Sequence, residues 1–222
     1  MCGRFILTLE ASQLEQEFGI KEVPDGYQPR FNVAPTQSIA TVIDAEERKI
    51  EMLRWGLIPS WAKDPSIGSR MINARSETAA DKPAFRQAFQ KRRCLILADG
   101  FFEWQRPPGK RSPAIPYVFR RKENKPFAFA GLWEAWKPEE GDWMRTCTIL
   151  TCSANELVSS VHDRMPVILT GDTAWKWMLS PSRSELEALL APYPGEDMLA
   201  YPVSTLVNKP DQDHPDLIRP VA

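Results

Sequence analysis

Short strand-like runs constrain the fold of this chain more than any other feature of its sequence. Several of them alternate apolar and polar residues or are rich in β-branched and aromatic residues, which is typical of half-buried strands. The runs cover residues 38–43, 50–55, 94–99, 116–120, 126–132, 146–151 and 166–169. Helical stretches interrupt them irregularly, unlike the regular alternation of a doubly wound sheet. We therefore expect an α+β fold with a strand-rich, mainly antiparallel, barrel-like core and inserted helices.

Apolar spacing and helix-end signals predict the inserted helices. One carries Leu14 and Phe18 and stops at Gly19. Ser153 and Glu156 have the spacing of a capping box, which predicts a short helix with His162 at its C-terminal end. The other predicted helices begin at Pro83 and continue to about residue 89, and cover Asp172–Leu179 and residues 184–190.

Composition indicates a single domain over residues 1–222, because 43% apolar residues and eight tryptophans suffice for a packed core. The net charge of −1 means that any attraction to phosphate must come from a local patch. Four cysteines form no CxxC pair and there are only two histidines, so we expect no metal and no cofactor. Without a signal peptide or a membrane-spanning run, we expect a cytoplasmic, nucleoid-associated monomer that contacts no membrane.

Cys2 directly follows Met1, so loss of the methionine creates a 1,2-aminothiol at the chain end. Such a group condenses with an aldehyde through nitrogen and then through sulfur, which closes a thiazolidine ring. An α-amine has a pKa of about 8, and a cysteine thiol, with a pKa of about 8.5, reacts as its thiolate. The Arg4 cation is expected to favour the thiolate and to disfavour the ammonium.

Every other polar candidate also has a purely structural interpretation. Asn73 could cap a turn before a helix, and His162 could cap the end of one. Glu103 could lie on the solvated face of a strand. The remaining candidates, for which surface ion pairs or core packing are the ordinary explanation, are Arg75, Arg164, Trp61 and Trp104.

Seven segments of the chain match one pattern together and in the same order. They are MCGRF at 1–5, RFNVAP at 30–35, RWGLIPSW at 54–61, INARSET at 72–78, RCLILADGFFEW at 93–104, AGLW at 130–133 and VHDRMP at 161–166. The set closely resembles the SRAP family of abasic-site processing proteins, which crosslink to abasic sites in single-stranded DNA. The resemblance extends from Cys2 to about Asn208.

The resemblance implies a role for each candidate. Cys2 matches the nucleophile, Asn73 the residue that holds it, Glu103 the acid that moves protons during sugar opening, and His162 the residue that assists opening and crosslink reversal. The implied DNA contacts are phosphate contacts at Arg4, Arg75 and Arg164 and base contacts at Trp104 and Trp61. The implied partner is single-stranded DNA with abasic sites, with replication-fork proteins as further partners. No role is implied for Cys152 or His214.

Physical chemistry supports this interpretation independently. An abasic deoxyribose is mostly a closed hemiacetal, so an acid and a base must open it before an amine can reach the aldehyde. Arginines bind phosphate in a bidentate manner, and tryptophans stack on bases without reading sequence. We therefore expect thiazolidine crosslinking at abasic sites, with autocatalytic Met1 removal and an AP-lyase reaction as side activities.

Two other functions remain open at this point. The first is an amidohydrolase or peptidase that uses an N-terminal cysteine, with Asn73 and the Gly3 backbone as oxyanion donors. The second is a reader of single-stranded or modified DNA that binds without covalent chemistry. Crosslinking that depends on Cys2 distinguishes the crosslinking function from both.

Overall fold

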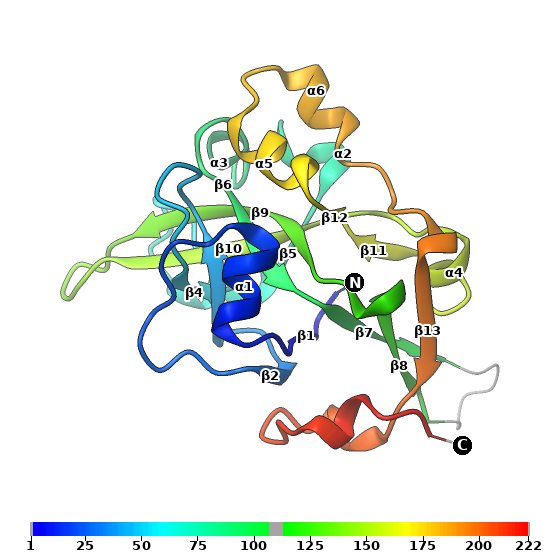
Figure 1. Cartoon of the computed structure of the whole chain (residues 1–222). Coiled ribbons are helices and arrows are strands. Elements are labelled where there is room, and N and C mark those ends of the chain that lie inside the picture. The colour runs from blue at the N-terminus through cyan, green and yellow to red at the C-terminus, as the bar shows by residue number, and fades with distance from the viewer. Residues whose placement is uncertain (1, 107–112, 222) are drawn as a thin grey trace.

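Two β-sheets form the centre of the protein, and helices lie around them (Figure 1). The computed structural model describes residues 2–106 and 113–221, so Met1 and its predicted removal lie outside the described residues. The strands are β1 (Phe5–Leu7), β2 (Arg30–Val33), β3 (Ser38–Val42), β4 (Glu51–Trp55), β5 (Asn73–Arg75), β6 (Arg93–Ala98), β7 (Gly100–Gln105), β8 (Ile115–Arg121), β9 (Phe127–Trp136), β10 (Met144–Ser153), β11 (Arg164–Pro166), β12 (Ile168–Leu169) and β13 (Met198–Pro202).

The helices are short and lie outside the sheets. The α-helices are α1 (Ala11–Phe18), α2 (Ser76–Ala79), α3 (Arg86–Lys91), α4 (Glu156–Ser159), α5 (Asp172–Leu179) and α6 (Arg183–Ala188). The 3-10 turns are η1 (Pro65–Arg70), η2 (Lys122–Asn124), η3 (Gly195–Asp197), η4 (Thr205–Asn208) and η5 (Pro215–Ile218). Among the residues that the structure describes, none of these helices combines the length and the apolar character that a membrane span requires.

The larger sheet closes on itself, which confirms the expected barrel-like core. Its strands follow the order β10, β4, β3, β6 and β9, and β9 pairs again with β10. Of the strand pairs between the described elements, β10–β4 and β10–β5 are parallel and the others are antiparallel. The smaller sheet has the order β13, β8, β7, β1 and β2.

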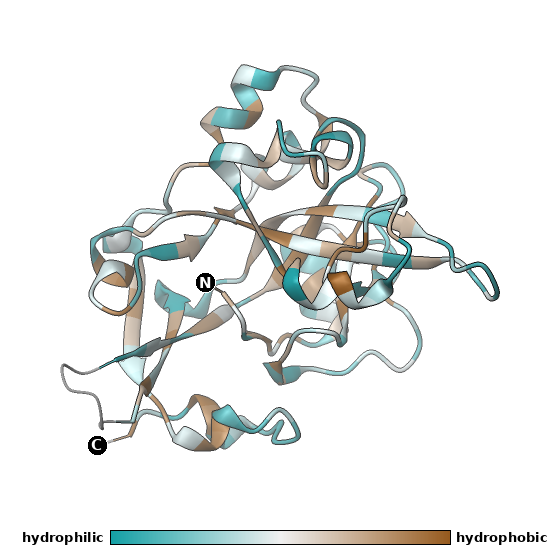
Figure 2. Cartoon of the chain, turned by 180° about the vertical axis from the view of Figure 1, so that it is seen from behind, coloured by the Kyte–Doolittle hydropathy of each residue, from teal (hydrophilic) through white to brown (hydrophobic). Residues whose placement is uncertain are grey.

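Phe5 on β1 joins the two sheets. Its ring meets Trp55 of β4 at 5.3 Å and Phe129 of β9 at 5.6 Å between centroids, both edge to face. All three side chains are buried, and hydrophobic residues lie along the strands while hydrophilic ones dominate the loops (Figure 2). Because Phe5 is anchored in this aromatic cluster, the position of the chain three residues earlier, at Cys2, is also restricted.

The predicted helices are found, with changes at their ends. The helix α5 has its predicted bounds, and α1 ends before Gly19, whose φ of 62° suits glycine. The predicted capping box is wrong, because Asn155 and not Ser153 caps α4: its side chain accepts a hydrogen bond from the Val158 N–H. The helix predicted from Pro83 begins instead at Arg86, and the one predicted at 184–190 is α6.

The C-terminal part of the chain packs against the smaller sheet. After β13, which pairs with β8, the turns η4 and η5 run below β2 and β8 (Figure 1). The carboxylate of Asp213 accepts hydrogen bonds from the backbone N–H of Phe31, at 2.6 Å, and from Arg30. The edge of β2 is therefore covered by the C-terminal segment.

Candidate functional site

Cys2 lies at the centre of the candidate site and is fully buried. The Asn73 side chain donates a hydrogen bond from Nδ2 to the Cys2 carbonyl oxygen, at 2.8 Å. Asn73 is the first residue of β5, where the parallel register opposite Ile149 of β10 fixes it. The Oδ1 atom of Asn73 is buried and has no hydrogen-bond partner within the described residues. This side chain can therefore accept one further hydrogen bond beside Cys2.

Glu103 lies next to Cys2 because β1 and β7 are paired. Phe5 is opposite Phe101, and the Phe102 N–H donates to the Arg4 carbonyl at 2.9 Å. Continuing this antiparallel register puts Gly3 opposite Glu103. The Glu103 side chain is buried. It therefore does not lie on a solvated strand face, which was one of the locations that the sequence allowed.

Burial raises the pKa of Glu103, and the nearby His162 charge opposes that shift. A carboxyl group with a raised pKa exchanges its proton closer to neutral pH, which suits a general acid or base. His162 is therefore close enough to influence the protonation of Glu103.

The thiol of Cys2 is held in its protonated form. Burial raises its pKa, and the negative charge of Glu103 raises it further. The expectation that the Arg4 cation favours the thiolate is wrong for this structure. The thiol lies 4.0 Å from the Arg4 carbonyl oxygen, while the Arg4 guanidinium is bonded elsewhere. The amine of a freed Cys2 is thus the better placed first nucleophile.

His162 follows α4 and is partly exposed. Its Nδ1 atom lies 3.0 Å from the backbone nitrogen of Arg164 and 3.0 Å from the Asp163 carboxylate. A neutral ring accepts a hydrogen bond from the Arg164 N–H, whereas a protonated ring donates one to Asp163. The hydrogen bond from the Arg164 N–H therefore fixes the orientation of the ring.

Arg4 is a buried cation, 9% exposed. Its Nη1 atom donates to Asn32 Oδ1 at 2.7 Å and to the Val207 carbonyl at 2.5 Å, and its guanidinium lies 6.0 Å from the Trp104 ring centre. Across residues 2–106 and 113–221, no carboxylate lies within ion-pair distance of it. Burial without a neutralising partner is unfavourable, so an anion that reaches Arg4 gains from its charge.

Arg164 already has an anionic partner. Its Nη1 and Nη2 atoms donate to the two carboxylate oxygens of Glu77 at 2.5 and 2.9 Å, and Nη2 also donates to the Thr151 carbonyl at 2.5 Å. Arg75 lies opposite Thr151 in the β5–β10 register and is exposed. The structure thus brings Arg75 and Arg164 to the same end of β10.

The two tryptophan candidates lie in different places. Trp104 follows Glu103 on β7, and its Nε1 donates to Asn208 Oδ1 at 2.7 Å. Trp61 is 61% exposed and lines a separate polar hollow with Pro83, Arg86 and Glu134. The adjacent Ala62 is bonded to Trp136, which pairs with Met144 at the other end of β10. Ala62, the neighbour of Trp61, therefore lies near the end of β10 opposite to Arg75.

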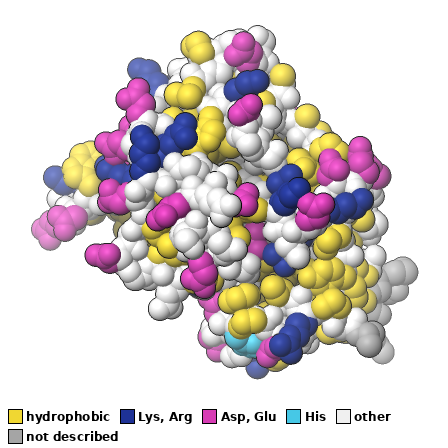
Figure 3. All heavy atoms as spheres, viewed as in Figure 1, with side chains coloured by type: hydrophobic (Ala, Val, Ile, Leu, Met, Phe, Trp, Pro, Cys, Tyr) yellow, Lys and Arg dark blue, Asp and Glu magenta, His cyan; other side chains and the backbone are white. Residues whose placement is uncertain are grey.

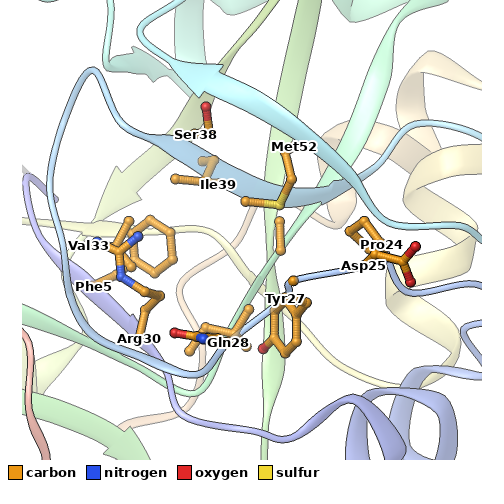
Figure 4. A pocket seen from close by; sticks show the side chains of 13 residues that line it. Phe5, Pro24, Asp25, Tyr27, Gln28, Arg30, Val33, Ser38, Ile39 and Met52 are labelled. Atoms are coloured by element: carbon orange, nitrogen blue, oxygen red, sulfur yellow. The ribbon is translucent and has the colours of Figure 1, made fainter.

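A cavity of about 260 Å³ opens on another part of the barrel. It lies between the loop at Asp25–Gln28 and strands β3 and β4, with Phe5 and Met52 among its apolar lining residues (Figure 4). None of Cys2, Asn73, Glu103 and His162 lines it. Figure 3 shows basic, acidic and hydrophobic side chains together on one face of the molecule.

Sequence reasoning did not assign roles to several residues that hold the site together. Asn32, Glu77 and Asn208 all contact candidate residues, through bonds to Arg4, Arg164 and Trp104 respectively. Asn32 and Glu77 fall inside two of the matching segments, and this was the only available signal for them. Within the described residues, no group of three or more His, Cys, Asp or Glu side chains could hold a metal ion.

Comparison with known proteins gives a consistent result. The chain matches the family described as SOS response associated peptidase (SRAP) over residues 1–210. It is 48% identical to the abasic site processing protein YoqW of Bacillus subtilis over 98% of this chain and 99% of that one. It is 32% identical to the abasic site processing protein HMCES of Gallus gallus, over 100% of this chain and 78% of that one.

Solved structures show the same fold. A crystal structure of a protein from Bacteroides thetaiotaomicron has a TM-score of 0.87 and 26% identity, and covers 100% of both chains. One from Bordetella bronchiseptica has a TM-score of 0.78 and 27% identity, covering 91% of this chain and 100% of that one. On its sequence match and its fold together, this chain belongs to the SRAP family.

Proposed function

We propose that this protein processes abasic sites in single-stranded DNA by forming a covalent thiazolidine crosslink through Cys2. The observation that carries the proposal is that Asn73 and Glu103 lie beside Cys2, which would become a terminal aminothiol on loss of Met1, and that His162 lies near Glu103. The names of the relatives, abasic site processing proteins, support the substrate class.

The proposed reaction has two steps after loss of Met1. Hydrolysis of the Met1–Cys2 peptide bond consumes one water and frees the Cys2 amine. The amine then adds to the sugar aldehyde and expels one water, which gives a Schiff base. The Cys2 sulfur adds to the imine carbon, and the thiol proton moves to nitrogen to complete the five-membered ring.

The surrounding residues have distinct roles in this scheme. Asn73 holds the Cys2 carbonyl, and its free Oδ1 accepts a hydrogen bond from the new amine. Glu103, with its raised pKa, donates a proton to the departing hydroxyl and to the ring oxygen of the sugar. His162, whose ring is oriented by the Arg164 N–H, assists opening of the sugar and reversal of the crosslink.

The DNA backbone is proposed to lie across the arginines. Arg4 offers a cation without a carboxylate partner among the described residues, and Arg75 and Arg164 extend the basic surface at the end of β10. Trp104 stacks on a base beside the lesion, and Trp61 contacts the strand farther away. Binding that depends on phosphates is sequence-tolerant and weakens as salt rises.

The test is a crosslinking assay with purified protein and a single-stranded oligonucleotide that contains one abasic site. We expect a slow-migrating band on a denaturing gel that is lost with Cys2→Ala, and an intact mass that shows Met1 removed. No band with the wild-type protein, or an undiminished band with Cys2→Ala, contradicts the proposal.

The same assay separates the two other functions. An amidohydrolase turns over small amides in a Cys2-dependent manner and leaves no DNA adduct. A non-covalent reader binds DNA equally well with Cys2→Ala and leaves no covalent product. Strand cleavage that depends on the Cys2 amine but not on its sulfur identifies the lyase side reaction.

A further inference from the structure

The C-terminal turn η4 touches both candidate DNA contacts nearest to Cys2. Its Val207 carbonyl accepts a hydrogen bond from Arg4 at 2.5 Å, and its Asn208 side chain accepts one from Trp104 at 2.7 Å. These two contacts join segments that are 203 and 104 residues apart in the sequence. No pattern in the local sequence of this turn predicts either contact.

Asn32 locks the turn in place. It is fully buried, and its Nδ2 atom donates to the carbonyl oxygens of Val207, Lys209 and Gln212 at 3.3, 3.0 and 2.6 Å. Its Oδ1 atom accepts from Arg4. One amide side chain therefore holds the C-terminal segment and the Arg4 guanidinium at the same time.

Trp104 and Arg4 also contact each other, with the guanidinium 6.0 Å from the ring centre. The indole of Trp104 is held at its outer end by Asn208, which is itself exposed. Long side chains lose rotamer freedom when they bind a ligand, and that loss weakens binding unless the folded protein has already ordered them.

We propose that Asn208, together with Asn32 and the Val207 carbonyl, is a positioning device that orders Trp104 and Arg4 before single-stranded DNA binds. We call these three groups the C-terminal clamp. The inference rests on the proposed function, because it assigns the clamp to the DNA-contacting side chains of that site. The clamp does not touch the reacting atoms, so it affects strand binding and not the chemistry at Cys2.

The central variant is Asn208→Ala, because the Asn208 side chain is exposed and bonds to Trp104. Its matched control is Thr205→Ala, which removes another exposed and uncharged polar side chain of the same turn and leaves the net charge unchanged. Fluorescence anisotropy with an undamaged single-stranded oligonucleotide measures binding. Crosslinking against protein concentration, with an abasic oligonucleotide, separates the half-saturating concentration from the maximal rate.

We expect Asn208→Ala to raise the half-saturating concentration in both assays by about tenfold, the factor that ordering one or two long side chains can contribute. The maximal crosslinking rate and the adduct formed with free 2-deoxyribose, followed by intact mass, stay at the wild-type level. In a Trp104→Phe background, which lacks the indole N–H, Asn208→Ala has no further effect.

Three results would contradict the proposed C-terminal clamp. They are an Asn208→Ala protein that binds DNA like Thr205→Ala, a loss confined to the maximal rate, and an undiminished effect of Asn208→Ala in the Trp104→Phe background. A wild-type protein that binds single strands but forms no crosslink contradicts the proposed covalent function. The anisotropy comparison still decides whether the clamp exists in that case.

Discussion

The Glu77 carboxylate binds the Arg164 guanidinium in the way that a DNA phosphate would. We therefore expect Glu77→Gln to tighten the binding of single-stranded DNA. The two side chains form a bidentate pair, with the Arg164 side chain 14% exposed and the Glu77 side chain 48% exposed. The pKa of Glu77 is lowered, chiefly by its hydrogen bond with Arg164, so the carboxylate stays charged at neutral pH. A phosphate must displace it to reach Arg164.

The size of the effect follows from the exposure of the pair. Solvent screens the half-exposed carboxylate, so the pair contributes about 1 kcal/mol and not the larger value of a buried one. Removing the competing charge converts this into roughly fivefold tighter binding. Arg164 keeps its place in the variant because the Thr151 carbonyl still accepts from Nη2, at 2.5 Å.

The assay is fluorescence anisotropy of a single-stranded abasic oligonucleotide at low salt, in a Cys2→Ala background that prevents covalent capture. Glu51→Gln is the matched control, because it breaks a pair with Arg145 near the opposite end of β10 and changes the net charge equally. Glu77→Gln binding no tighter than Glu51→Gln would refute the competition. Weaker binding would mean that Glu77 instead orients Arg164 for the phosphate.

Three further outcomes are expected. Asn73→Ala loses the 2.8 Å bond to the Cys2 carbonyl, and the single-turnover crosslinking rate should fall on the order of a hundredfold, whereas a change of less than threefold argues against positioning. Glu103→Gln should unfold at a higher temperature than the wild-type protein at pH 7 and should lose crosslinking activity. A pKa raised in the folded state stabilises the fold only below the ordinary pKa of a carboxyl, and this contribution disappears as pH rises through the folded value. A melting temperature of Glu103→Gln that is equal to or below that of the wild-type protein contradicts this prediction. Asp99→Ala leaves the Arg120 guanidinium, 2.6 Å away and buried, without its partner, and should cost about 3–5 kcal/mol in urea unfolding; a loss below 1 kcal/mol would show that water replaces the pair.

Several elements could be predicted because their signals are local. The strand expected at 94–99 is β6, the one expected at 146–151 lies within β10, and α5 has its predicted bounds. Alternation and helix-end signals act over a few neighbouring residues, so they survive in the folded chain. The three-residue strands β1 and β5 have no such pattern, and long-range pairing alone creates them.

The candidate site likewise has residues that the sequence predicts and contacts that only long-range packing creates. The order of the matching segments predicted Cys2, Asn73, Glu103 and His162 as site residues, and in the structure Asn73 and Glu103 lie beside Cys2. The contacts of Arg4 could not be predicted, because Asn32 and Val207 are distant in the sequence and meet it only after β1 and the C-terminal turn have docked. The exposed position of Trp61 likewise depends on a contact between distant segments, because its neighbour Ala62 is bonded to Trp136 of β9.

What the amino-acid order established is chemical: a cysteine directly after Met1, and a set of acids, bases and cations of suitable types. What only the folded chain decided is electrostatic and geometric. Burial raises the pKa values of Cys2 and Glu103. Arg4 is buried without a carboxylate partner among the described residues, and Arg164 forms an ion pair with Glu77. These properties depend on solvent exclusion and on contacts across more than eighty residues, and neighbouring residues in the sequence carry no information about either.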